Sequence, residues 1–168
     1  HSHRRQQVHG NQENQDLVSF IERSLNPDFL GYHGLAVGDV NGDGLEDLYV
    51  CQPGGLPNLL FRQEQDGTLV DISADARVDW LDNTTGSLLV DLDNDGDLDL
   101  VAVLGSKVVV QANDGSGKFE LKTVIDSASS LFSINAIDYD GDQDLDLFQH
   151  VVPGLLFFLG GTLSPQFF

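Results

Sequence analysis

The sequence predicts an all-β fold, and three observations lead to this prediction. Three short acidic runs recur along the chain, alternating apolar and polar residues flank each run, and Asp-Gly turns separate further apolar segments. Alternation with a period of two residues is typical of half-buried strands, and Asp-Gly between apolar segments is a strong hairpin signal. The chain has 168 residues, of which 40% are hydrophobic, so one domain with a sizeable core is possible.

Each acidic run spans nine residues and carries a carboxylate or carboxamide at positions 1, 3, 5 and 9. The runs are Asp39–Asp47, Asp91–Asp99 and Asp138–Asp146. Together they hold 14 of the 27 acidic residues, so the acidity is local and not that of a solvated tail. Packing gives no reason to crowd like charges so tightly. A hard cation does, because Ca²⁺ takes about six to eight oxygen ligands.

Strand-like segments precede and follow every acidic run, which predicts a unit of strand, loop and strand. Two more strands fit between one run and the next. They are Asn58–Arg62 and Leu69–Ser73 in the first unit, and Lys107–Ala112 and Lys118–Ile125 in the second. Four antiparallel strands in about 50 residues are typical of a β-propeller blade.

The repeat divides the chain into an N-terminal extension, 1–33, and a repeat region, 34–168. In the extension, apolar residues at near-helical spacing predict a short helix at Gln15–Leu25. The third unit is less complete, because it offers only Leu155–Leu159 after its first two strands. The expected blades are about 34–82, 83–130 and 131–168.

The number of predicted blades is too small to close a ring. Propellers have about four to eight blades, whereas this chain carries about two and a half to three. We therefore expect a partial β-propeller. Further blades of a longer chain or other copies of this chain would complete it, or it would remain an open stack with protected edges.

The predicted Ca²⁺ ligands are the oxygen-bearing side chains at positions 1, 3, 5 and 9 and the backbone carbonyl at position 7. We expect two or three ions, with a mainly structural role, because unpaired carboxylates at this density repel one another. The ligands are Asp39, Asn41, Asp43, Leu45 and Asp47 in the first run, Asp91, Asp93, Asp95, Asp97 and Asp99 in the second, and Asp138, Asp140, Asp142, Asp144 and Asp146 in the third.

Position 6 of each run is predicted to turn sharply, which suits Gly44 and Gly96. The third run has Gln143 at this position. If the position needs a positive φ, glutamine costs about 1 kcal/mol relative to glycine. We therefore expect the third site to be weaker, distorted or without an ion.

An EF-hand is disfavoured because its loop needs a bidentate glutamate at position 12 and a helix on each side. The residues at position 12 are Val50, Ala102 and Gln149. None of these side chains can chelate a cation with two oxygens, and the flanking segments have the period of strands.

Charge and composition exclude several classes of function. The formal net charge is −19 with only eight Lys and Arg, so nucleic-acid binding is not expected. No apolar stretch is long enough to span a membrane. The single cysteine, Cys51, is predicted to be a buried, inert thiol. Trp80, His33 and His150 are expected to serve packing or to lie on the surface, and no catalytic constellation is visible.

The segments around the runs resemble FG-GAP/VCBS repeats, the calcium-loop blades of integrin α-subunit propellers and of many bacterial secreted proteins. The segments AVGDVNGDGLEDLYV and LLVDLDNDGDLDLVAV carry the resemblance. PNLLFRQEQDGTLVDIS is similar to the second half of the repeat, with Leu69 in place of a phenylalanine. The order most resembles bacterial secreted proteins akin to cartilage acidic protein. The resemblance covers about residues 34–150.

These observations predict an extracellular or secreted, non-enzymatic Ca²⁺-binding module for adhesion, ligand binding or assembly. Loops of this kind fill readily where free Ca²⁺ is about millimolar, as outside cells. The expected partners are an unknown protein or glycan ligand and further blades or copies of the chain. One alternative is an accessory or catalytic part of a secreted carbohydrate-active enzyme, and the other is a subunit of a self-assembling extracellular structure.

Overall fold

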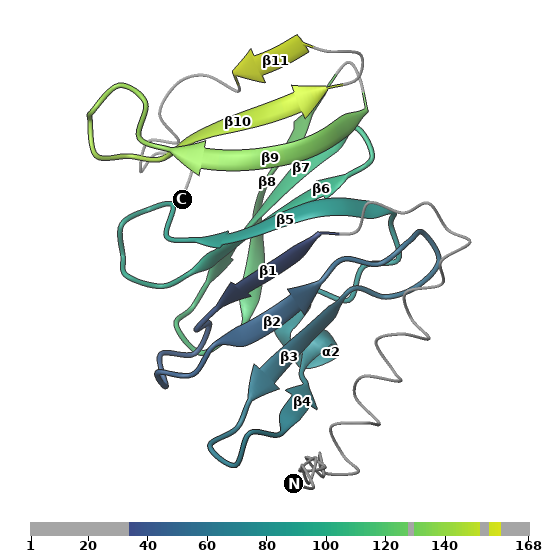
Figure 1. Ribbon diagram of the computed structural model, residues 1–168, viewed down its shortest axis with the longest axis vertical. Helices are drawn as coiled ribbons and strands as arrows, with labels where there is room; N and C mark the ends of the chain where they lie inside the picture. Colours follow the sequence, from purple (N-terminus) through teal and green to yellow (C-terminus); the bar gives the residue numbers. More distant parts are fainter. Residues whose placement is uncertain (1–33, 128–129, 152–154, 159–168) are drawn as a thin grey trace, which may run out of the picture. The chain divides into compact units, whose positions relative to one another are not determined.

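A computed structural model describes residues 34–127, 130–151 and 155–158 of the chain. Contacts between Cα atoms divide the chain into two units, His1–Gly31 and Tyr32–Phe168, and every described residue belongs to the second. The helix predicted at Gln15–Leu25 lies outside the described residues. The described part contains three antiparallel sheets (Figure 1), so the all-β prediction is confirmed.

The first and the middle sheets each contain four strands in sequential order, joined by hairpins. The first sheet consists of β1 (Leu35–Gly38), β2 (Asp47–Val50), β3 (Leu59–Gln63) and β4 (Leu69–Asp71), and the middle sheet of β5 (Thr84–Val90), β6 (Asp99–Leu104), β7 (Lys107–Asn113) and β8 (Phe119–Asp126). The third sheet has the described strands β9 (Leu131–Ile137), β10 (Asp146–Val151) and β11 (Leu155–Phe158), in the order β11-β10-β9.

The strand predicted at Leu69–Ser73 is shorter than expected. It ends at Asp71, and a four-residue helix, α2 (Ser73–Ala76), follows. The carboxylate of Asp71 accepts a hydrogen bond from the backbone N–H of Ser73 at 3.0 Å, and the Ser73 hydroxyl accepts one from the N–H of Leu60 at 2.8 Å. Such local side-chain bonds compete with the strand ladder. Arg77 ends the helix in a left-handed conformation.

Two apolar clusters hold the sheets together. The first lies between the first and middle sheets and includes Tyr49, Leu60 and Leu100. The second lies between the middle and third sheets and includes Val101, Val103, Ile134 and Leu147. Strand β1 contacts β5, and β5 contacts β9 (Figure 1), so the middle sheet is covered on both faces. The consecutive apolar residues 100–103 of β6 are therefore all buried.

Cys51 is buried in the first cluster, as predicted, and its Sγ lies 3.3 Å from the hydroxyl oxygen of Ser87. Burial raises the pKa of the thiol to about 11, so it stays protonated and unreactive at neutral pH. Trp80 is partly buried against the same cluster. None of the described helices is long and apolar enough to cross a membrane.

Candidate metal centre

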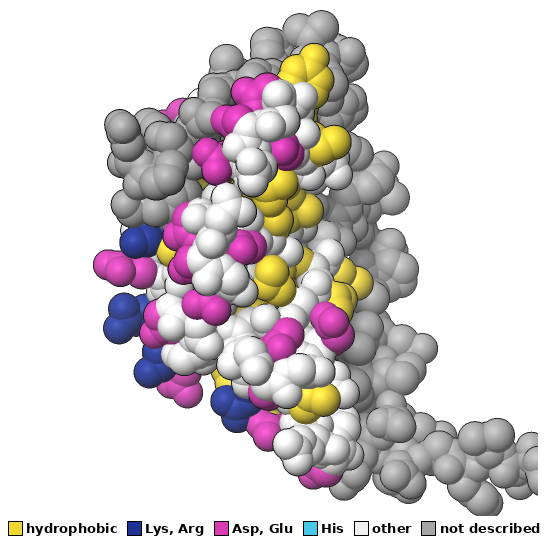
Figure 2. Space-filling model, turned by 90° about the vertical axis from the view of Figure 1, so that its left-hand side faces the viewer, with side chains coloured by type: hydrophobic (Ala, Val, Ile, Leu, Met, Phe, Trp, Pro, Cys, Tyr) yellow, Lys and Arg dark blue, Asp and Glu magenta, His cyan; other side chains and the backbone are white. Residues whose placement is uncertain are grey.

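The three acidic runs form the turns between the first two strands of their sheets, β1–β2, β5–β6 and β9–β10. We call them the first, middle and third loops. Position 9 of each run opens the second strand and is buried, with Asp47, Asp99 and Asp146 at most 5% exposed. The remaining acidic residues lie at the turn. Figure 2 faces the side from which the loops project and shows acidic side chains along it.

Positions 4 and 6 have a positive φ in all three loops. Glycine tolerates this conformation, whereas other residues pay a steric penalty of about 1–2 kcal/mol. The middle loop places asparagine at position 4, and the third loop places glutamine at position 6. The residues at positions 4 and 6 have φ values between 61° and 97°. They are Gly42 and Gly44 in the first loop, Asn94 and Gly96 in the middle loop, and Gly141 and Gln143 in the third loop. The prediction that position 6 turns sharply is confirmed, and Gln143 adopts the unfavourable conformation.

The aspartate at position 9 ties each loop to its sheet. One of its oxygens accepts a hydrogen bond from the backbone N–H of position 2, at 3.0, 3.1 and 3.0 Å in the three loops. In the first two loops the other oxygen accepts one from the third strand of the sheet. The donors are the N–H of Gln63 for Asp47, at 2.9 Å, and of Asn113 for Asp99, at 3.0 Å. A carboxylate has about four acceptor sites, so a lone pair remains for a cation.

Backbone N–H groups of the loop hold the remaining side chains inward. The aspartate at position 1 accepts a hydrogen bond from the N–H of position 6, at 2.7, 3.1 and 3.1 Å. The side chains at positions 3 and 5 each accept one from the N–H two residues further on, between 2.8 and 3.3 Å. These repeated turns organise oxygen atoms without consuming all their lone pairs.

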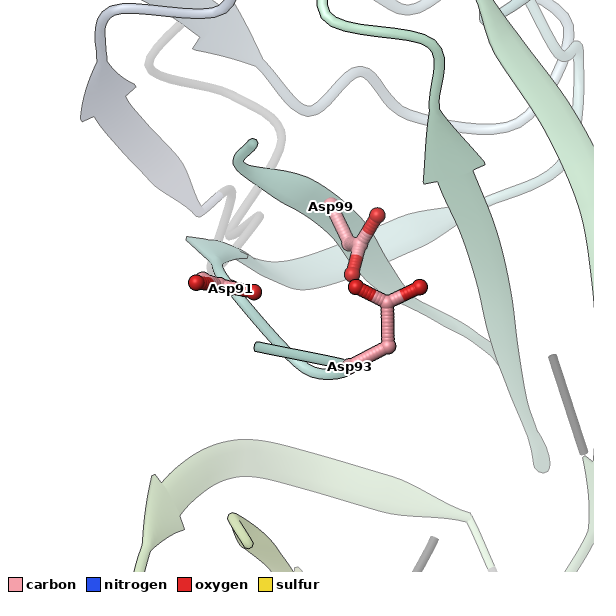
Figure 3. Close-up of side chains that lie close together, drawn as sticks. All are labelled: Asp91, Asp93 and Asp99. Carbon is pink, nitrogen blue, oxygen red and sulfur yellow. The ribbon is translucent and has the colours of Figure 1, made fainter. Parts of the chain in front are cut away.

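The carboxylates converge in two of the three loops. One oxygen from each of Asp91, Asp93 and Asp99 lies within 4.8 Å of the others (Figure 3), and Asp138, Asp140 and Asp146 form the same arrangement. Oxygens that share one Ca²⁺ at about 2.3–2.6 Å are at most about 5 Å apart. The middle and third loops therefore bring positions 1, 3 and 9 to distances that one ion can bridge.

The other predicted ligands lie outside these triads. In the first loop, Asn41 at position 3 donates to the Asp43 carboxylate at 2.9 Å, and Asp39 accepts bonds from four backbone N–H groups. The carboxylates at position 5, which include Asp95 and Asp142, do not join the triads of the described residues. Position 7 contributes only its backbone carbonyl to the predicted ligand set.

A buried oxygen in the middle loop tests whether the site fits a cation. Oδ1 of Asp91 is shielded from solvent and has no hydrogen-bond partner. A buried carboxylate oxygen without a partner is costly, and a cation beside it would remove that cost. The donors are all oxygens, which is the chemistry that Ca²⁺ prefers. The residues of this loop therefore fit a Ca²⁺ ion.

The electrostatics of the loops are consistent with this fit. Burial raises the pKa of Asp99 to about 6, although N–H bonds oppose the rise, and the negative charges of Asp93 and Asp95 add to it. Burial, followed by the charge of Asp95, also raises the pKa of Asp93. For Asp39, slight burial is outweighed by its backbone N–H bonds, which lower the pKa. The carboxylates of the middle loop thus repel one another electrostatically when no cation offsets their charge.

Two asparagine side chains connect the loops of neighbouring sheets. The buried amide of Asn113 donates to the carbonyl of Val40 in the first loop at 2.8 Å and to that of Leu98 in the middle loop at 3.1 Å. The amide of Asn94 donates to the backbone carbonyl of Gln143 and to the side-chain carboxylate of Asp144, both at 3.2 Å. Neither link could be predicted from the sequence, in which the two residues look like ordinary turn asparagines.

Comparison with known proteins identifies the repeat. The chain matches the FG-GAP-like repeat at residues 39–102 and 91–148, and each match begins at an acidic run. This chain belongs to the FG-GAP-like repeat family. The first match runs from the first loop into strand β6, and the second runs from the middle loop into strand β10. The two matches share residues 91–102, which include the middle loop.

The FG-GAP-like chain is also similar to cartilage acidic protein 1. It is 30% identical to the protein from Xenopus tropicalis over 128 residues, which cover 71% of this chain and 20% of that protein. It is 29% identical to the protein from Homo sapiens over 127 residues, which cover 71% of this chain and 19% of that protein. The chain thus spans about a fifth of the length of the curated relatives it matches.

Proposed function

We propose that this chain is a Ca²⁺-stabilised, non-catalytic segment of an extracellular FG-GAP-like protein, with surfaces for ligand binding, adhesion or assembly. The triad of Asp91, Asp93 and Asp99, with its unpartnered buried oxygen, is the observation that carries the proposal. The same triad recurs in the third loop. An extracellular location suits such loops, because free Ca²⁺ is about millimolar outside cells, where modules with weak sites function.

The proposed ligands are the side chains at positions 1, 3, 5 and 9 and the carbonyl at position 7 of each loop. A bound Ca²⁺ supplies two positive charges that offset the repulsion among the carboxylates. The protein's own contribution is orientation: backbone N–H groups hold positions 1, 3 and 5, and position 9 connects the loop to the third strand. An ion bound by these groups would therefore stabilise the sheet as well as the loop.

We also propose that the three sheets are consecutive blades of a larger propeller. The first sheet exposes Leu35 and Val37, which are 64% and 60% exposed, on the face opposite the middle sheet. Apolar residues side by side on a sheet face favour a partner that covers them. Further repeats of a longer chain suit this role, because the chain spans only a fifth of its curated relatives. Assembly from copies of the chain is the alternative.

The proposal can be tested by thermal unfolding with Ca²⁺ and with EDTA. A ligand that binds only the folded state stabilises it by about 2.7 kcal/mol per site at one hundred times its Kd. We expect Ca²⁺ to raise Tm by several degrees. Substituting Asp91 and Asp93 with Asn should remove much of this rise, whereas Glu120→Gln on the exposed surface of β8 should not. An unchanged Tm in EDTA, with no measurable Ca²⁺ uptake, would contradict the proposal.

A further inference from the structure

A cavity of about 530 Å³ lies beside the turn between β6 and β7. Trp80 and Asp82, from the segment between α2 and β5, form one side of it. Lys107 and Gln111 of β7 and Leu121 and Val124 of β8 also line it. Its volume is within the range of about 300–1,000 Å³ found for small-molecule sites.

The cavity is separate from the acidic loops. Strand β6 begins at Asp99 in the middle loop and ends at Leu104 on the cavity wall. Five residues of a strand span about 17 Å. A ligand in the cavity would therefore not contact an ion in the middle loop, and the two sites can be tested independently.

The apolar part of the cavity combines two exposed aliphatic side chains with the ring of Trp80. Leu121 and Val124 are 56% and 42% exposed. Trp80 stands on a fixed segment, because its carbonyl accepts a hydrogen bond from the N–H of Asn58 at 3.0 Å and the next carbonyl accepts one from Gly55 at 2.8 Å. A large aromatic ring on a rigid support beside exposed aliphatic groups suits the flat apolar face of a ligand.

The polar part of the cavity is formed by Gln111, Lys107 and Asp82. Gln111 is 4% exposed, and its Nε2 donates to the carbonyl of Arg77 at 3.3 Å, but its Oε1 has no hydrogen-bond partner. This oxygen is shielded from solvent, so the polar groups that a ligand can reach at the rim are those of Asp82 and Lys107. Lys107 and Asp82 bring opposite charges to the same cavity, and the Nζ of Lys107 also lies 3.9 Å from Oδ1 of Asp126 in β8.

We propose that this cavity binds a neutral sugar unit of a glycan. A pyranose ring combines an apolar face, which would pack on Trp80 and Leu121, with hydroxyls that both donate and accept. Those hydroxyls match the charged groups of Asp82 and Lys107 at the rim. The inference rests on the ligand-binding role proposed above and names its ligand class. An acidic glycan fits less well, because the strongly acidic chain repels it.

The test uses the fluorescence of Trp80, the only tryptophan in the chain. The Ca²⁺-loaded chain is titrated with neutral tetrasaccharides of glucose, mannose, galactose, xylose and N-acetylglucosamine. At least one should produce a saturable change in tryptophan emission, with a Kd of about 1 mM or tighter. Sulfated and uronic-acid oligosaccharides and an unstructured peptide are titrated in parallel.

Substitutions at the rim assign the signal to the cavity. Leu121→Ala should weaken binding about tenfold, because it removes an apolar contact. Asp82→Asn should weaken it about threefold, because it replaces a charged acceptor with a neutral one. Both side chains are exposed, so their loss should leave the fold intact, which melting curves check. Val70→Ala and Glu120→Gln, at exposed positions outside the cavity, are the matched controls and should bind normally.

Three results would overturn the inference. They are no saturable change with any neutral sugar, binding that Leu121→Ala and Asp82→Asn leave unchanged, and a response confined to the acidic sugars or the peptide. Calorimetry with Ca²⁺ on the same protein separates this inference from the proposed function. Ca²⁺ binding without sugar binding overturns only the cavity assignment, whereas sugar binding without Ca²⁺ binding overturns only the proposed role of the loops.

Discussion

The middle sheet and the two outer sheets begin with the same strand, loop and strand, but they differ in what covers them (Figure 1). At loop position 2, Val40 and Leu92 are 1% exposed, whereas Tyr139 in the third loop is 72% exposed. Two residues before the loop, Val37 in the first sheet is 60% exposed, whereas Leu89 in the middle sheet packs against the first cluster. Equivalent residues are therefore buried where a neighbouring sheet lies against them.

This difference shows that a repeat of this kind can pack against a neighbouring sheet on each of its two faces. Its apolar positions serve two faces, and the middle sheet is the one that uses both. In the first sheet the uncovered side carries Leu35 and Val37, and in the third it carries Ile137 and Tyr139. These are the positions at which further repeats would pack if the sheets are blades of a larger propeller.

The largest expected effect is the difference in unfolding free energy between a substitution at a covered position and one at an uncovered position. Leu100 of the middle sheet is fully buried in the first cluster. Leu100→Ala should lower the free energy of unfolding by about 2–5 kcal/mol, because it leaves a cavity. Leu35→Ala, on the uncovered face of the first sheet, should change it by less than about 0.5 kcal/mol. Denaturant unfolding measures both, and equal losses would show that the outer face is covered in solution.

The buried aspartate of the middle loop gives the next effect. Its pKa of about 6 lies above the ordinary value of 3.8, so Asp99 favours folding below about pH 4 and this contribution is lost as the pH rises through 6. For the Ca²⁺-free protein, the loss from pH 4 to pH 7 should be about 2–3 kcal/mol from this group. Urea unfolding at several pH values measures it. Asp99→Asn should flatten the profile over this range, and an unchanged profile would contradict the assignment.

The link between the first and middle loops can be broken at Asn113. Asn113→Ala removes the donor to the carbonyls of Val40 and Leu98 and should cost about 1–3 kcal/mol. Asn94→Gly, which breaks the exposed link to the third loop without placing a strained side chain at this positive φ, should cost less than about 1 kcal/mol. Thermal unfolding compares the two variants. If the exposed link proved the more important, burial would not be what gives these bonds their strength.

The smallest effect concerns position 6. Gln143→Gly relieves a left-handed glutamine and should strengthen Ca²⁺ binding to the third loop about fivefold, the equivalent of about 1 kcal/mol. Gly96→Gln in the middle loop should weaken its site by a similar factor. Calorimetric titration of both variants with Ca²⁺ measures the affinities of the third and middle sites. A third site that stays unchanged while the middle site weakens would mean that Gln143 is accommodated without strain.

The local features of this fold could be predicted from the sequence. The acidic runs, the Asp-Gly hairpins and the alternation of apolar residues depend on neighbours along the chain, so the strands lie within a residue or two of their predicted positions. The strand predicted at Leu69–Ser73 stopped early because Asp71 bonds to the backbone two residues on. The turn at position 6 followed from the spacing and is confirmed by the φ of Gln143.

The features that depend on packing between sheets could not be predicted in this way. The links made by Asn113 and Asn94 join residues 73 and 49 positions apart, and the cavity combines the segment around Trp80 with β7 and β8. The oxygen of Asp91 that lacks a partner is likewise visible only once the loop is folded. The sequence identifies ligand types and spacing, whereas the sheets decide which side chains meet.

Calorimetric titration of the Ca²⁺-stripped chain tests the central claim most directly. The triads of the middle and third loops and the strained Gln143 predict saturable binding of at least two ions, with the third loop weaker than the middle one. Replacing Asp91 and Asp93 with Asn should abolish binding at one site and leave the others measurable. If the unmodified chain takes up no Ca²⁺ at millimolar concentrations, the acidic loops are not metal sites.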